Sequence, residues 1–177
     1  MTQLLSAGEI GRLNTASDVS NTDTVTLYQN GVLRTAPVSD LTGGVIRTAQ
    51  VTLTSAQILA LNATPISVLA APGAGLANVI VGVYATKAAG TAYADVATGD
   101  DIAFKYTNAS GGIGATLEMT GFADSASATQ AYANGAASPL PVANAAIVAH
   151  MLTGEITTGN SPFLLTILYR TFPVPAF

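Results

Sequence analysis

The side chains that most often carry out catalysis are scarce in this chain. His150 is the only histidine among 177 residues, and cysteine is absent. The common pairing of a histidine base with a cysteine nucleophile, and a zinc site built from several histidines or cysteines, therefore cannot be assembled within one copy. His150 lies in the apolar run NAAIVAHML, which indicates a residue at the edge of the core or in a contact. We assign no catalytic residue, no metal ligand and no cofactor.

The ten acidic residues form one obvious local cluster, in which Asp100 and Asp101 are adjacent and Asp95 is near. Neighbouring residues on a strand point to opposite faces, which does not suit hydrolysis by two facing carboxylates. The segment DVATGDDIAF could offer oxygen ligands to a hard cation, but it lacks the spacing of a dedicated calcium loop. A solvated turn is the favoured interpretation, and a weak cation site is the alternative.

Two glycine-rich motifs could in principle bind phosphate. APGAGLAN and SGGIGATL lack the lysine of a phosphate loop and the spacing of a dinucleotide-binding fingerprint. Each stands between two predicted strands rather than at the start of a long helix. Both motifs are therefore predicted to be turns.

The amount of charge is the most informative feature of the composition. Charged residues make up 9% of the chain, where about a quarter is typical, and the mean hydropathy is +0.45. A monomer needs a charged surface without large apolar patches to stay dispersed. The composition therefore predicts that much of the surface is covered by copies of the same chain or by another protein. The alternative is a neutral polar surface made of Ala, Gly, Ser and Thr.

Several partners are excluded by the same numbers. The net charge is −4 and the six basic residues are scattered singly, so no stripe of charge could neutralise a run of phosphates. The longest apolar stretch, LANVIVGVYA, has about half the roughly 20 residues that a membrane-spanning helix needs. The first residues lack the pattern of a signal peptide. We expect neither a nucleic acid nor a membrane as a partner.

Strands dominate the predicted secondary structure from Val45 onward. Short apolar runs alternate with Gly, Pro, Asn and Ser, which predicts a β-sandwich of seven or eight strands. The one convincing helix is TSAQILALN, with Thr54 or Ser55 as its N-cap. The Ala-rich stretch from Ser125 to Ala145 is predicted to be a long loop, either mobile or reaching onto a neighbouring subunit.

The last strand carries apolar residues on both faces, as expected for a strand between a core and a subunit contact. Leu165, Ile167 and Tyr169 are the residues that we place either in the core or in that contact.

Residues 1–44 differ in character from the remainder. A polar stretch is followed by TVTLYQNGVLRTAPV, in which Asn30-Gly31 favours the type I′ turn of a hairpin. Gly43-Gly44 then separate this segment from the next extended run. The expected organisation is an N-terminal attachment segment over residues 1–44 and a β-sandwich body over residues 45–177.

The N-terminal stretch SDVSNTDTVTLYQNGVLRTAPVSDL resembles the opening segment of many phage fibre and head-fibre proteins. The matching residues are Asp23, Val25, Leu27, Tyr28, Gln29, Gly31, Arg34, Val38, Ser39 and Leu41. The body looks like a family of small phage virion proteins, on its "Leu-x-Ala-x-Pro" and "Ala-Pro-Gly-Ala" motifs and its terminal LLTILYRTF. Family members often carry a basic residue where this chain has Leu76, so the local contact can differ here.

The resemblance implies a trimeric, jelly-roll-like component of the virion. It implies that the N-terminal segment attaches the protein to the particle, through Asp23, Leu27, Tyr28, Gly31 and Arg34. The favoured function is a capsid decoration or head-fibre protein that binds the assembled shell and stabilises it. The alternative is a short tail fibre or fibre adaptor that presents loops to a host receptor, although a chain that is 6% aromatic and lacks tryptophan is poorly suited to stacking on sugars. A polysaccharide-cleaving spike would need a longer chain and a carboxylate pair.

Overall fold

A computed structural model describes residues 24–29, 32–37, 45–96, 100–154 and 156–174. The chain divides into two compact units, Met1–Thr42 and Gly43–Phe177, which are treated separately below. In the first unit, β1 (Thr24–Gln29) and β2 (Val32–Pro37) pair as an antiparallel hairpin with Leu27 opposite Arg34. The expected Asn30-Gly31 turn and the Gly43-Gly44 boundary lie outside the described residues.

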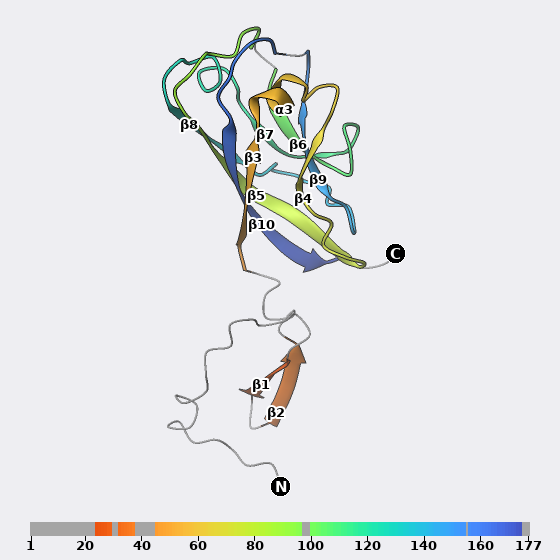
Figure 1. Ribbon diagram of the computed structural model, residues 1–177. Helices are drawn as coiled ribbons and strands as arrows, with labels where there is room; N and C mark the ends of the chain where they lie inside the picture. Colours follow the sequence, from red (N-terminus) through yellow and green to blue (C-terminus); the bar gives the residue numbers. More distant parts are fainter. Residues whose placement is uncertain (1–23, 30–31, 38–44, 97–99, 155, 175–177) are drawn as a thin grey trace, which may run out of the picture. The chain divides into compact units, whose positions relative to one another are not determined.

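The second unit consists of two four-stranded antiparallel sheets packed face to face (Figure 1). The first sheet has the order β3-β10-β5-β8, and the second has the order β4-β9-β6-β7. The strands are β3 (Arg47–Leu53), β4 (Ile66–Leu69), β5 (Leu76–Lys87), β6 (Ile102–Tyr106), β7 (Ile113–Leu117), β8 (Thr129–Asn134), β9 (Ile147–Met151) and β10 (Phe163–Pro173).

The order of the strands is that of a jelly roll. Along the chain, successive strands cross from one sheet to the other, and β6 and β7 alone are consecutive neighbours within a sheet. Eight strands arranged in this way form two interlocked Greek keys. The expected all-β, jelly-roll-like sandwich is confirmed. Seven or eight strands were predicted for the body, and its described residues form eight.

The core lies between the two sheets and is made by alternate residues of each strand. In β10 the side chains of Phe163, Leu165 and Ile167 are fully buried, and β6 contributes Ile102 and Phe104 from the opposite sheet. Because alternate side chains point to opposite faces, each strand leaves a second set of residues outside the sandwich. That outer set is what the molecule can present to a partner.

The short helix α3 (Ser55–Leu59) closes one end of the sandwich (Figure 1). Thr54 is its N-cap: the side-chain oxygen accepts from the Gln57 backbone N–H, and the Gln57 side chain accepts from the Thr54 backbone N–H. This reciprocal capping box satisfies two donors that the helix itself leaves unpaired. The predicted helix is confirmed, and of the two proposed caps Thr54 is the one used.

The turn between β4 and β5 needs the glycines that the sequence places there. Gly73 and Gly75 have φ angles of +106° and +72°, values that other residues rarely adopt. The Leu76 backbone N–H donates to the Gly73 carbonyl at 3.2 Å. The prediction that APGAGLAN is a turn is therefore confirmed.

The predicted loop from Ser125 to Ala145 is wrong in its middle, because β8 lies within it and pairs with β5. The segment TQAYAN buries one alanine, Ala133, and leaves polar residues or Tyr132 on its other face. Such an edge strand has little apolar periodicity, and its pairing with β5 rather than its own propensity defines it. Among the described residues, no helix is long and apolar enough to cross a membrane.

Candidate functional site

The largest candidate surface is the outer face of the first sheet. Cross-strand pairing aligns three outward positions on each of its four strands. We call this set the neutral face, and it comprises Thr48, Gln50, Thr52, Gly82, Tyr84, Thr86, Gln130, Tyr132, Asn134, Leu164, Thr166 and Leu168. None of these residues is charged. Three large side chains on it are exposed: Tyr132 by 54%, Leu164 by 41% and Tyr84 by 37%.

The ring of Tyr132 lies across Gly82 on this face. A methyl group at position 82 would come within 2.3 Å of the Tyr132 hydroxyl oxygen and 2.8 Å of the ring carbon that carries it. The absence of a side chain at Gly82 is therefore what lets the ring rest against the sheet. A tyrosine whose hydroxyl end rests on the sheet in this way has less rotamer freedom to lose on binding.

Hydrogen bonds also order the neighbouring side chains. The Tyr84 hydroxyl donates to the Gln130 side-chain oxygen across β5 and β8. On the other half of the sheet, Gln50 Nε2 donates to Thr166 Oγ1 at 3.3 Å. The neutral face is thus partly ordered by its own cross-strand contacts.

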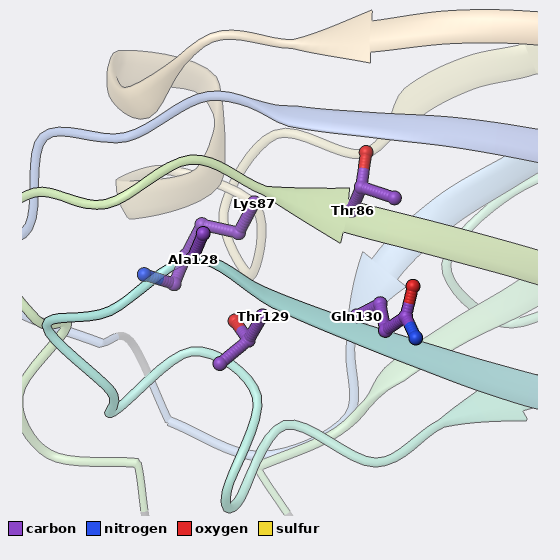
Figure 2. A pocket seen from close by; sticks show the side chains of 5 residues that line it. All are labelled: Thr86, Lys87, Ala128, Thr129 and Gln130. Carbon is purple, nitrogen blue, oxygen red and sulfur yellow. The ribbon is translucent and has the colours of Figure 1, made fainter.

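A shallow, open depression lies where β5 ends and β8 begins. Figure 2 shows its lining by Thr86, Lys87, Ala128, Thr129 and Gln130. Lys87 is 2% exposed, and its ammonium group donates to the carbonyl oxygens of Ser125 at 2.7 Å and Ser127 at 3.2 Å. The lysine holds the segment before β8 and offers no free charge to a ligand in the depression.

The outer face of the second sheet differs because it carries basic groups. Lys105 Nζ lies 3.3 Å from His150 Nδ1 and donates to the Ala109 carbonyl at 2.7 Å. Burial, and secondly the nearby Lys105 charge, hold the pKa of His150 below its ordinary value, against a hydrogen bond with the Asn62 backbone that raises it. A neutral His150 can accept a hydrogen bond from Lys105. The single histidine is therefore at a sheet surface in contact with another side chain.

The carboxylates of the acidic cluster accept hydrogen bonds from nearby groups of the same chain. Asp101 accepts a hydrogen bond from the Met119 backbone N–H at 3.1 Å, and Asp95 accepts one from the Thr157 hydroxyl. Burial, and also the neighbouring Glu118, raise the pKa of Asp101, while the Thr120 backbone N–H lowers the pKa of Glu118. Within the described ranges, no group of three histidines or carboxylates is placed to hold a metal ion.

Two tyrosines carry buried hydroxyl groups. Tyr93 donates to the Ser161 carbonyl at 2.7 Å, and burial raises the pKa of Tyr93 to about 12. The Tyr106 hydroxyl is buried without a hydrogen-bond partner, and burial raises the pKa of that tyrosine as well. Both phenols stay protonated at neutral pH, and both side chains pack in the hydrophobic core.

The residues singled out from the sequence are found in two places. Leu165 and Ile167 lie inside the sandwich core, and Tyr169 is partly buried against it. Leu27 and Tyr28 lie in β1 and Arg34 lies in β2. Asp23 and Gly31 fall outside the described residues.

Sequence reasoning missed the neutral face. The tyrosines at 84 and 132 stand in segments of unlike appearance, and one of those segments was assigned to a loop. The available signal was the spacing of two residues between Tyr84 and Thr86 and between Gln130 and Tyr132, which places each pair on one face of its strand. The pairing of the two strands, which no local pattern contains, was needed to bring them together.

No protein-family model matches this chain, and no curated protein matches it. Among solved structures, a chain of the cyanophage Pam1 capsid asymmetric unit matches with a TM-score of 0.42 and 12% sequence identity, over 98% of this chain and 100% of that chain. A TM-score at this level carries no argument about function.

Proposed function

We propose that this chain is a non-enzymatic structural protein of a bacteriophage particle that decorates the assembled capsid. In this proposal, residues 1–44 attach the protein to the shell and residues 45–177 form an oligomeric body over it. The observation that carries the proposal is that five of the ten residues matching the phage-fibre motif, Val25, Leu27, Tyr28, Gln29 and Arg34, lie in the hairpin of a separate compact unit, while the body is a jelly roll with a wide uncharged face.

The hairpin supports the attachment role. Leu27 and Arg34 are cross-strand partners, and Tyr28 is the next position along the same strand. Three of the five proposed attachment residues are thereby brought within two adjacent rows of one hairpin. A compact element of this kind can bind as a unit, because its register is fixed by pairing.

The body supports an assembly role through mass action. A protein that binds the assembled shell and not its free subunits stabilises the shell, and several linked copies multiply modest contacts into high avidity. Jelly rolls are common in viral capsid domains, although the same fold also serves lectins and enzymes. The fold is therefore compatible with the proposal, and the hairpin motif and the missing surface charge favour it.

The test uses phage shells that lack this protein. Purified protein is mixed with the shells, bound protein is measured after sedimentation, and shell melting is followed by calorimetry. Binding with a raised melting temperature is expected. The double variant Tyr28→Ala with Arg34→Ala should lose binding, whereas Thr35→Ala, an exposed position on the same hairpin, should keep it.

Two outcomes would contradict the proposal. Equal binding by the double variant and Thr35→Ala would remove the attachment role of these residues. Failure of the wild-type protein to bind shells, together with binding to tails or host cells, would favour the tail-fibre alternative.

A further inference from the structure

We infer that the neutral face is the surface through which one copy of this chain binds a second copy. The inference rests on the proposed function, because it names the surface by which the body would assemble. The neutral face contains no charged residue at twelve outward positions, whereas an ordinary surface of that size would carry about three or four charges. The neutral face is therefore one continuous area in which the chain carries no charge.

The residue types on this face suit a protein interface. Tyrosine is enriched in interfaces and among the residues that dominate binding energy, and lysine and acidic residues are depleted there. Tyr132 and Tyr84 are cross-strand partners, and both are exposed. Threonine, glutamine and asparagine around them can exchange hydrogen bonds with a like surface at little desolvation cost compared with charged groups.

Electrostatics decides which partner fits. A charged surface docked here would lose water and find no opposite charge, which costs free energy. A neutral partner avoids this cost, and a chain with 9% charged residues is itself such a partner. The outer face of the second sheet carries Lys105 and His150, so it is the poorer match. The neutral face of another copy is the surface of known chemistry that fits.

The area of the face shows how far the contact must extend. Four strands about 4.8 Å apart, over five residues at about 3.3 Å each, cover about 320 Å². One partner of a stable dimer buries about 800 Å². Neighbouring apolar residues have to contribute the difference, and Val45 and Ile46, 51% and 46% exposed, directly precede β3. The paired strands β5 and β10 also run on past β3 and β8, where Val79 and Phe172 are partly exposed. The cross-strand partner of Val79 there is Arg170, an exposed cation, so the uncharged area ends at this margin.

The experiment uses the absence of cysteine from the chain. Thr52→Cys places a single thiol on the neutral face, and Thr116→Cys places one on the outer face of the second sheet. Both are exposed threonines on edge strands, so they form a matched pair. In full-length protein that light scattering shows to be assembled, the thiol at 52 should react with maleimide about tenfold or more slowly than the thiol at 116. Equal rates in the assembled protein would overturn the inference.

A second variant tests the same face by introducing charge. Leu164→Lys adds an ammonium group at a 41% exposed position on the neutral face, and Thr116→Lys is its control. Leu164→Lys should reduce the scattering mass to that of a monomer, and Thr116→Lys should not. If Leu164→Lys stays assembled, the inference is wrong. If Leu164→Lys does not fold, the comparison of maleimide rates at positions 52 and 116 still tests the inference.

The outcomes separate this inference from the proposed function. If the wild-type protein is monomeric and position 52 becomes protected only when shells are added, the shell covers the face; the inference then fails and the proposed function stands. If copies assemble through the face but ignore shells, the inference stands and the proposed function fails.

Discussion

Lys87 is a charged side chain with 2% of its surface exposed, and its removal tests how the start of β8 is held in place. Its ammonium group donates to the carbonyl oxygens of Ser125 at 2.7 Å and Ser127 at 3.2 Å, with a longer contact of 3.4 Å to Ala88. Lys87→Met keeps most of the aliphatic length and removes the donors. The change therefore isolates the hydrogen bonds from the packing of the side chain.

The expected loss follows from those contacts. A hydrogen bond to a charged group contributes about 1.5–3 kcal/mol, so the two shorter bonds are worth about 3–6 kcal/mol before offsets. Methionine no longer has to bury an ammonium group, and the carbonyls of a surface segment can turn to water, both of which recover part of the loss. We expect Lys87→Met to lower the free energy of unfolding by about 2 kcal/mol, which corresponds to a melting temperature about 5–10 °C lower.

Urea unfolding followed by circular dichroism measures this loss, since the chain has no tryptophan for fluorescence. Wild type and variant are compared at one protein concentration, because assembly makes apparent stability depend on concentration. Lys105→Met is the control: Lys105 is less buried, donates to the Ala109 carbonyl at 2.7 Å and also lies 3.3 Å from His150 Nδ1. If Lys87→Met is no more destabilising than Lys105→Met, Lys87 does not hold the segment before β8.

Three further changes test other parts of the structure. Ile167→Ala, at a fully buried position, should lower the free energy of unfolding by about 3 kcal/mol in the same urea assay; a loss below about 1 kcal/mol would place Ile167 outside the core. Burial and Glu118 raise the pKa of Asp101, so its carboxyl binds a proton more readily in the folded chain and stability falls as pH rises through that pKa. Asp101→Asn should therefore melt higher than wild type at pH 7 and lose this advantage in acid, and an unchanged difference would refute the link. The pKa of His150 is lowered by burial and then by Lys105, so the stability that depends on neutral His150 is present above pH 6.5 and falls as pH drops below it. NMR of this single histidine should show its pKa moving upward, but not to its ordinary value, in Lys105→Met; no movement would exclude the Lys105 charge as a cause.

Local chemistry in the sequence was enough to predict the sandwich and its ends. The Thr54 cap and the Gly73 and Gly75 turn are set by residues within a few positions of each other, and the structure has both. Strands with strong apolar patterns, such as β5 and β10, were also recognisable. These features depend on backbone preferences and on periodicity, both of which are present in a short window of sequence.

β8 could not be recognised in the same way. Its residues TQAYAN have one buried member, Ala133, and the inward positions are threonine and alanines, so the apolar alternation that marks a half-buried strand is weak in the sequence. Its stability comes from pairing with β5 and from the Lys87 contacts to the segment before it. Both are long-range interactions, and a strand defined mainly by its neighbours has only a weak local signal in the sequence.

The neutral face depends on two properties of the chain, its low content of charged residues and the register of its strands. The sequence predicted that the chain would assemble, because 9% charged residues leave too little charge for an ordinary monomer surface. It did not locate the contact, and it left Leu165, Ile167 and Tyr169 open between core and interface. The register resolves the geometry of that strand. Leu165 and Ile167 are fully buried, so the residues that alternate with them, Leu164, Thr166 and Leu168, form the outward row. Because a shift by one residue would exchange the two rows, the pairing of β10 with β3 and β5 determines which half of the strand is available to a partner.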